Sequence, residues 1–425
     1  MIPDKEQDVP PTLLILMRVD VNEQNPIRSQ GTDAKGRLRR LEDGKSYYLL
    51  AAILDPAQQT TSAPVSYLEL EGETRKTYNA IIDRVESLSA RYYDPDGYVC
   101  QPERFDAPAQ KKLSEDLSAV GNQVYQLFDH SGNPVWEWLE RLMKPQRAGG
   151  QSRDSEDRPL QPVSIITNDF NIPWYWLKRK NVGPFLCEVC SLGLLQLRAI
   201  METDATPQPA ANYGRRALLI NGSPTLPFTR EVLDEVDKCL SVESRRGKFQ
   251  VERVASTDDM HHQFALYDQG NNEVFREFRI VHFSGHYGET DLMLKDTIIS
   301  KYLLAPFIQD SVLVLDGCSS AQGLKGWTDV ESLTSQLINK GKARGCVVTM
   351  LPVKDDPILG KLFWREFYTN LRRGDCPVGY ALAKARIALK KFLESIGSDN
   401  PMWALYQLIG SPTVPLFEKD DTRHG

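Results

Sequence analysis

Short apolar runs alternate with segments of helical period along the second half of the chain. The apolar runs are bounded by turn residues and predict buried strands at 216–222, 249–254, 278–285, 311–317, 345–351 and 406–410. Apolar positions that recur at spacings of three and four predict helices at 229–242, 258–267, 330–340, 357–371 and 377–393. Strands that alternate with helices are typical of a mostly parallel sheet with helices on both faces, so we expect an α/β fold.

The first half of the chain contains the same kinds of segment at less regular intervals. Its pattern predicts strands at 13–19, 46–54 and 162–168, and helices at 73–90 and 110–128. Two polar stretches interrupt it. Residues 146–158 are rich in Gly, Ser and charge, and residues 203–213 carry two prolines. We place the domain boundary in the second stretch, which divides the chain into residues 1–205 and residues 206–425.

Composition narrows the class of protein. A length of 425 residues favours two domains, and 41% hydrophobic with 25% charged residues is ordinary for a globular chain. The net charge of −6 argues against direct nucleic-acid binding. The N-terminal region lacks a secretory layout, no segment reaches the roughly 20 apolar residues of a membrane span, and the seven cysteines are scattered. We therefore expect a cytoplasmic location, reduced thiols and no membrane association.

Two reactive side chains directly follow two of the predicted strands. His286 follows the strand at 278–285 and is flanked by Gly285 and Gly288, while Cys318 follows the strand at 311–317. Functional groups of parallel sheets gather beyond the carboxyl ends of the strands. If these two strands are parallel neighbours, His286 and Cys318 lie at the same edge of the sheet.

This pair of side chains suffices for acyl transfer. Cys318 would attack a peptide carbonyl as the thiolate, and His286 would accept its proton and return it to the leaving amine. Backbone N–H groups of Cys318 and Tyr287 would stabilise the oxyanion. His282 lies on the same face of its strand as His286, so it is the alternative base, although a buried structural role suits it better. Taken singly, a Cys after a strand is more often a small buried apolar residue.

Several motifs resemble the CHAT family of caspase- and separase-like cysteine proteases of prokaryotes. The resemblance rests on VHFSGH (281–286), LDGCSSA (315–321), WALYQLIG (403–410), IITNDFNIPWYWL (165–177) and the helix at 113–128, and it covers roughly residues 110–417. It implies a caspase-like catalytic subdomain with a His286–Cys318 dyad, preceded by a pseudo-caspase α/β subdomain that lacks the dyad.

The sequence departs from the family pattern at two places. Tyr287 stands where members usually have Gly after the catalytic His, and Ser319, Ser320 and Ala321 replace the usual Glu-Thr-Gly. If the oxyanion N–H requires a positive φ at position 287, tyrosine is costly there. Both departures favour an enzyme that awaits activation over one that is always active.

Asp316 lies two positions before Cys318. In several caspase-fold relatives an acidic residue at this place lines the primary specificity pocket, and the resemblance then implies cleavage after Arg or Lys. The alternative is an N-cap for the helix after Cys318. Basic specificity would make the 146–158 loop a self-cleavage site, with Arg147, Arg153 and Arg158 as candidates; the alternative is a tolerant surface loop.

Other residues carry weaker hypotheses. Cys187 and Cys190 have the spacing of half a zinc site, but no second pair follows, so core cysteines are the better interpretation. Four tryptophans, Trp136, Trp138, Trp174 and Trp176, fit core or subdomain-interface anchors better than a ligand cage. We expect no metal and no cofactor.

The leading hypothesis is a cysteine endopeptidase that cleaves partner proteins, after a basic residue, as a regulated effector of prokaryotic defence. The resemblance implies a protein substrate such as a gasdermin-like pore-former or a regulatory protein, and a separate activator protein, protease or ligand. One alternative is a catalytically decayed caspase-like scaffold that binds a partner without turnover. A second is a Rossmann-like ligand-binding protein.

Overall fold

The structure is a computed structural model of the chain, divided into two compact units. Unit 1 consists of Met1–Glu86 and Glu115–Leu197, and unit 2 consists of Ser87–Ser114 and Arg198–Gly425. The residues that the structure describes are 12–20, 30–32, 38–40, 45–54, 66–90, 106–129, 136, 139, 143, 160–169, 172–179, 183–196, 215–222, 228–244, 247–256, 258–259, 278–285, 291–294, 298–300, 308, 310–317, 343–351, 353, 356–373 and 376–417.

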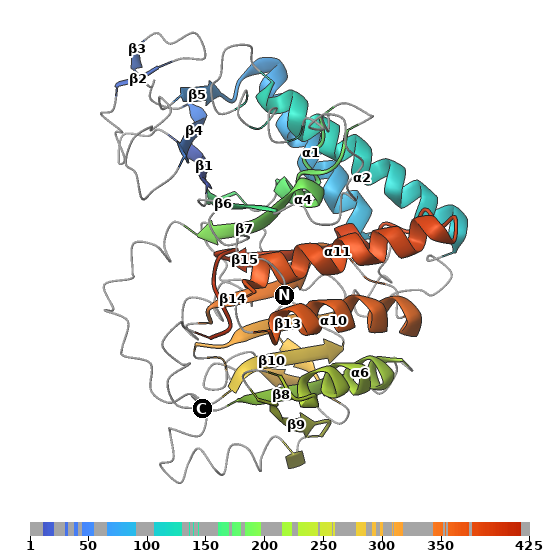
Figure 1. The fold of residues 1–425 in the computed structure, drawn as a ribbon. Coiled ribbons are helices and arrows are strands. Elements are labelled where there is room, and N and C mark those ends of the chain that lie inside the picture. Colours follow the sequence, from blue (N-terminus) through green and yellow to red (C-terminus); the bar gives the residue numbers. More distant parts are fainter. Residues whose placement is uncertain are drawn as a thin grey trace, which may run out of the picture. The chain divides into compact units, whose positions relative to one another are not determined.

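A mostly parallel run of strands forms the centre of unit 2 (Figure 1). Its strands lie in the order β15, β14, β13, β10, β8, β9. Neighbouring strands pair in parallel except at one end, where β15 is antiparallel to β14. The bounds are β8 Arg216–Gly222, β9 Gln250–Val254, β10 Phe278–Gly285, β13 Val312–Asp316, β14 Gly345–Thr349 and β15 Tyr406–Gly410. A separate antiparallel pair joins β11 (Asp291–Met293) to β12 (Ile298–Ser300).

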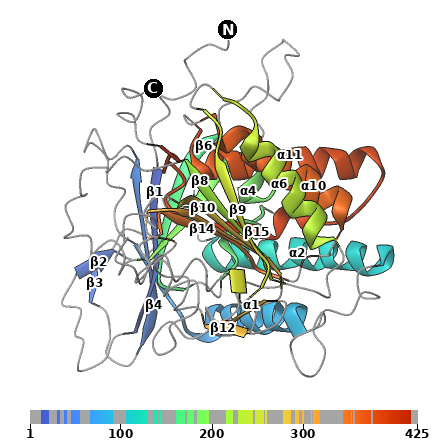
Figure 2. The ribbon, with the colours of Figure 1, turned by 90° about the horizontal axis from the view of Figure 1, so that it is seen from below.

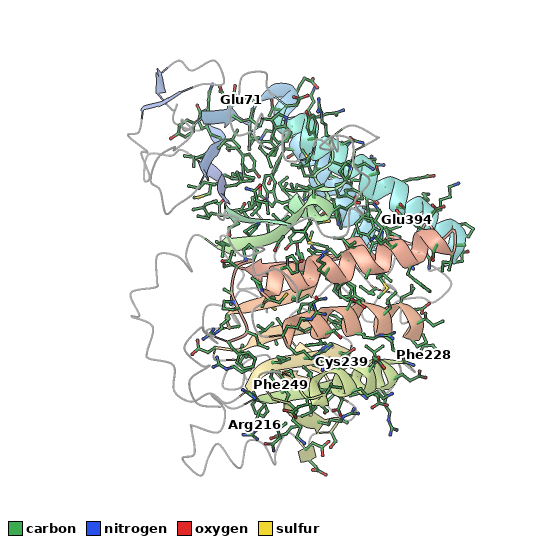
Figure 3. All side chains as sticks on the ribbon, in the orientation of Figure 1. Glu71, Arg216, Phe228, Cys239, Phe249 and Glu394 are labelled. Carbon is green, nitrogen blue, oxygen red and sulfur yellow. The ribbon has the colours of Figure 1, made fainter. Side chains whose placement is uncertain are left out.

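Three helices lie along one face of these strands, as Figures 1 and 2 show from two directions. They are α6 (Thr229–Ser241), α10 (Pro357–Leu371) and α11 (Val378–Ser395), and a short 3-10 helix, η6 (Met402–Ala404), precedes β15. Figure 3 labels Arg216 and Phe249 at the end where β8 and β9 begin, and Phe228 at the opposite end where α6 begins. The parallel strands β14, β13, β10, β8 and β9 therefore share one carboxyl edge, and α6 starts from it.

The central strands of unit 2 are apolar on both faces. All eight residues of β10 are buried, and so are all five residues of β14. A strand that is solvated on one face would alternate buried and exposed positions. Both faces of this sheet are thus covered, and each fully buried Val, Leu, Ile or Phe contributes about 1.5–3 kcal/mol relative to an exposed one.

Helix α10 packs against the strands through an aromatic stripe. Its start is fixed because the Asp356 side chain accepts hydrogen bonds from the backbone N–H groups of Ile358 and Leu359, and Pro357 occupies the first helical position. Buried Phe363, Trp364, Phe367, Tyr368 and Leu371 then follow at helical spacing. Trp364 and Tyr368 of this stripe contact His282 of β10.

Unit 1 has its own mixed run of strands, in the order β3, β2, β5, β4, β1, β6, β7. Strands β1, β6 and β7 pair in parallel, and β4 is antiparallel to both β1 and β5. The bounds are β1 Thr12–Asp20, β2 Gln30–Thr32, β3 Leu38–Arg40, β4 Ser46–Leu54, β5 Ser66–Glu69, α1 Gly72–Ala90, α2 Ala107–Phe128, β6 Gln161–Thr167, η4 Trp174–Trp176, α4 Leu186–Val189 and β7 Cys190–Gln196.

A buried carboxylate organises the core of unit 1. Asp169, just beyond β6, accepts hydrogen bonds from the hydroxyls of Tyr48 and Tyr78, the latter at 2.9 Å between Oδ2 and the phenol oxygen. The Trp174 indole N–H donates to the Asp169 carbonyl at 3.2 Å. Burial, followed by the charge of Asp169, raises the pKa of both tyrosines above the usual range. Phe128 meets the Tyr48 ring edge-on at 5.2 Å between centroids.

The expected α/β class is confirmed, and the mixed, mostly parallel sheet with its helices is consistent with a caspase-like fold. The expected strands and helices agree with the observed ones to within a few residues wherever the structure describes them. The helix expected at 330–340 and most of the helix expected at 258–267 lie outside the described residues. Strands β2, β3, β5, β7, β11 and β12 and the short helix α4 were not predicted. In the part of the chain that is described, no helix is long and apolar enough to span a membrane.

The tyrosine cluster of unit 1 predicts a loss of stability in alkali. An unfolded tyrosine ionises near pH 10, whereas Tyr78 keeps its proton in the fold because its pKa is raised. Its contribution to stability is present below pH 10 and is lost as the pH rises above that value, by about 1.4 kcal/mol per pH unit. Tyr78→Phe should therefore make the free energy of unfolding fall less steeply with pH, as measured by urea titration between about pH 9 and pH 11.

Phe128→Leu is the matched control, since Phe128 packs in the same cluster and does not ionise. It should lower stability by a similar amount at every pH. A Tyr78→Phe curve that stays parallel to the wild-type curve would contradict the prediction.

Candidate active site

The strands that precede the predicted dyad are parallel neighbours. Strand β10 pairs with β13 in a register that sets His282 opposite Val314 and Ser284 opposite Asp316. His286 is two positions beyond Ser284, and Cys318 is two positions beyond Asp316. The expected adjacency of these two strands is confirmed, and the chain leaves both at the same edge of the sheet.

His286, Tyr287 and Cys318 themselves lie outside the described residues, as does the 146–158 loop. Their assignments stay predictions. What the structure describes is the framework on which they are carried: Gly285 at the end of β10, and Asp316 and Gly317 at the end of β13.

Asp316 is held by donors from three different elements. The Tyr406 hydroxyl of β15 donates to Oδ1 at 2.8 Å, and the Trp364 indole N–H of α10 donates to Oδ2 at 2.8 Å. The Ser284 hydroxyl of β10 donates to the same Oδ2 at 3.3 Å. The side chain is 14% exposed. Neutral groups thus fix both carboxylate oxygens, and no Lys or Arg of the described chain pairs with them.

The backbone after Asp316 is fixed as well. The Thr349 hydroxyl, at the end of β14, donates to the carbonyl of Gly317. On the far side of the cluster, the buried Arg386 of α11 donates to the carbonyl of Tyr406, the residue whose hydroxyl binds Asp316. The chain that enters the Cys318 segment is therefore tied to both neighbouring strand ends.

Gly285 allows β10 and β8 to end in close contact. It pairs with Gly222, and a Cβ at position 285 would lie 2.5 Å from the Gly222 carbonyl carbon. Real Cβ atoms essentially never approach backbone this closely. A side chain at this position would push β10 away from β8 immediately before His286.

His282 is completely buried beneath the predicted site. Its Nδ1 lies 2.8 Å from the Tyr368 hydroxyl, and its Nε2 lies 3.8 Å from Asp316 Oδ2. The Trp364 ring meets the imidazole edge-on at 4.8 Å between centroids. The expectation that His282 is a buried, hydrogen-bonded residue agrees with this geometry.

The remaining described candidates lie in the core. Cys187 and Cys190 are buried, and the Cys190 thiol donates to the Leu186 carbonyl at 3.1 Å. Trp136, Trp174 and Trp176 are buried, as expected of core anchors, and Trp138 lies outside the described residues. Among the residues described, no group of three or more His, Cys, Asp or Glu side chains has the arrangement of a metal site.

Sequence reasoning missed the aromatic donors of this site. Trp364 and Tyr368 are four residues apart on a helix that was predicted, so their side chains project from one face. That spacing marks a shared face but not what the face contacts. Tyr406 opens the YQLIG strand, and nothing in the sequence points its hydroxyl at Asp316.

Comparison with known proteins leaves the family open. A scan against protein-family models gives no match, and no curated protein matches in sequence. A solved structure described as "Structure of Protease" aligns with 71% of this chain and 69% of its own, at 10% identity and a TM-score of 0.47. A similarity of this degree assigns neither family nor activity.

The close contact at Gly285 yields a stability prediction. Gly285→Ala should lower the free energy of unfolding by about 1–3 kcal/mol, because the backbone of Gly222 cannot move aside. Gly345→Ala is the matched control on β14, where the nearest atom is the flexible Leu408 Cδ1 at 3.2 Å. Chemical denaturation measures both. Equal losses in the two variants would contradict the steric account.

Proposed function

We propose that this protein is a cysteine endopeptidase of the CHAT type, with Cys318 as nucleophile and His286 as general base. The observation that carries the proposal is the parallel β10–β13 pair, whose register sets Ser284 opposite Asp316, each two residues before one member of the dyad. Equal offsets from paired positions support a dyad at a single edge of the sheet.

The chemistry of the proposed reaction requires no cofactor. His286 takes the proton of Cys318, the thiolate attacks the peptide carbonyl carbon, and a thioester forms as the protonated amine leaves. Water, deprotonated by His286, then hydrolyses the thioester and restores the thiol. The backbone N–H groups of Tyr287 and Cys318 are the proposed oxyanion donors.

Basic specificity is the finer part of the proposal. Asp316 is a largely buried carboxylate that receives hydrogen bonds from neutral Trp, Tyr and Ser groups. A buried negative charge is costly until a cation joins it. An Arg or Lys side chain of a substrate would supply that cation, which supports Asp316 as the acid of the specificity pocket.

The proposed biological role follows the family resemblance. The enzyme would act in the cytoplasm as a regulated effector of prokaryotic defence, and would cleave a gasdermin-like pore-former or a regulatory protein. A separate activator protein, protease or ligand would switch it on. Tyr287, in place of the family's Gly, favours such an activation step, and it also favours the alternative of a decayed scaffold that binds a partner without turnover.

The dyad predicts cleavage that depends on one thiol. Wild-type protein should hydrolyse fluorogenic peptides that end in Arg or Lys, and should do so faster than peptides that end in Leu or Asp. Cys318→Ala should reduce cleavage to the uncatalysed background because it removes the proposed nucleophile. Cys376→Ala is the control, because Cys376 is a partly exposed thiol outside the site and its loss should leave the rate unchanged.

Alkylation separates an inactive enzyme from a decayed scaffold. Cys187, Cys190, Cys239 and Cys346 are buried, and burial raises the pKa of the Cys239 and Cys346 thiols. In a Cys100→Ser, Cys376→Ser background, iodoacetamide should modify Cys318 first. Rapid alkylation without cleavage indicates that activation is missing. If the protein shows neither cleavage nor rapid alkylation of Cys318, the decayed scaffold is favoured.

Asp316→Asn should change which peptide is preferred. Loss of a charge-assisted pair with the substrate should lower the ratio of kcat/KM for Arg over Leu peptides by about 10- to 100-fold. Any damage to the framework would lower both rates together and leave that ratio unchanged. An unchanged ratio would therefore assign Asp316 to the framework and remove it from the pocket.

A further inference from the structure

A chain of three side chains leads from Tyr368 on α10 through His282 to Asp316 at the end of β13. The Tyr368 hydroxyl lies 2.8 Å from His282 Nδ1, and His282 Nε2 lies 3.8 Å from Asp316 Oδ2. Both Tyr368 and His282 are fully buried. The Nε2 atom has no hydrogen-bond partner within the described part of the chain, and at 3.8 Å its interaction with the carboxylate is electrostatic.

The charge of Asp316 near Nε2 decides the tautomer of His282. The Tyr368 hydroxyl carries a proton, since burial and the Asp316 charge raise its pKa well above the ordinary value. If that proton is donated to Nδ1, the ring carries its own proton on Nε2 and directs it at Asp316. The opposite tautomer leaves the tyrosine proton without an acceptor and points a lone pair at a carboxylate. Each tautomer leaves one donor without a hydrogen bond, so the charge of Asp316 decides between them: it attracts the Nε2–H of the first and repels the Nε2 lone pair of the second.

We propose that Tyr368 and His282 are positioning residues. Tyr368 holds His282 in the Nε2–H form, and His282 in turn orients the Asp316 carboxylate and the segment that carries Cys318. This inference rests on the proposed function. The effect is indirect: neither side chain is placed to contact substrate, and both act through Asp316, two positions before the nucleophile.

The surroundings of His282 support a positioning role. Among the residues that the structure describes, Asp316 from β13 and Tyr368 from α10 are the ionisable groups with a recorded interaction with its ring. Trp364 covers it edge-on and also donates to the same Oδ2 atom of Asp316. The imidazole and the indole thus approach one carboxylate oxygen together, and rotation of either ring would disturb the other.

The tautomer can be read without any catalytic assay. In protein labelled with ¹⁵N-histidine, His282 is assigned among the six histidines by its disappearance in His282→Gln. We expect a pyridine-like Nδ1 and a pyrrole-like Nε2 in the wild type. Tyr368→Phe should shift this ring toward the Nδ1–H form, because Nδ1 has lost its donor. A pyrrole-like Nδ1 in the wild type would overturn the proposal.

Kinetics test the positioning effect. Tyr368→Phe should lower kcat for Arg peptides by about 10- to 100-fold, because small displacements of reacting groups have effects of that size. KM should change less than about threefold, as expected of a residue that positions the reacting groups without binding substrate. Tyr175→Phe is the matched control: it also removes one buried hydroxyl hydrogen bond, to the Leu192 carbonyl at 2.6 Å, and it lies in unit 1. It should reduce the melting temperature comparably and leave kcat unchanged.

The two hypotheses fail in different ways. If the wild-type protein shows no Cys318-dependent cleavage, the proposed function is wrong. The alkylation rate of Cys318 then replaces kcat as the measurement that tests positioning. A rate altered at least threefold by Tyr368→Phe and not by Tyr175→Phe would support positioning. If Tyr368→Phe and Tyr175→Phe change kcat equally, or change the alkylation rate equally in a protein that does not cleave, the positioning proposal is overturned.

Discussion

The parallel pairing of β10 with β13 is the constraint on which the rest of the site depends. Parallel strands deliver their carboxyl ends to one edge, and this register sets Ser284 against Asp316. A shift of one residue would turn Asp316 to the opposite face of the sheet, away from Trp364. The hydrogen bonds from Ser284, Trp364 and Tyr406 therefore depend on the register, and they also stabilise it.

These hydrogen bonds make the strand end a rigid platform. Carboxylates in low-dielectric surroundings need donors, and here each donor comes from an element packed around β13: β10, α10 and β15. Thr349 of β14 adds a fourth tie through the Gly317 carbonyl. A chain segment that starts from such an anchor begins from a defined position and direction. That is the requirement for a nucleophile whose attack geometry must be accurate to fractions of an ångström.

The sequence predicted the framework far better than the polar interior of the site. Apolar runs such as 278–285 and 345–351 mark strands because burial on both faces selects apolar residues at every position, and the helix at 357–371 has caps and a period of its own. Strand β7 escaped prediction because Ser191 and Gly193 break its apolar run. The Asp316 cluster escaped because it joins residues up to 90 positions apart. Such contacts follow from the tertiary arrangement, which local pattern does not contain.

Unit 1 shows that an anchored carboxylate by itself does not mark a catalytic centre. Asp169 follows β6 and binds two tyrosine hydroxyls, much as Asp316 ends β13 and binds Trp364 and Tyr406. Yet the residues after Asp169, from 170 to 177, include neither His nor Cys. In both units, a carboxylate that accepts hydrogen bonds from buried aromatic side chains fixes the end of a strand. Chemistry is proposed for unit 2 because a His and a Cys follow its paired strand ends at equal distance, and this platform would hold them in place.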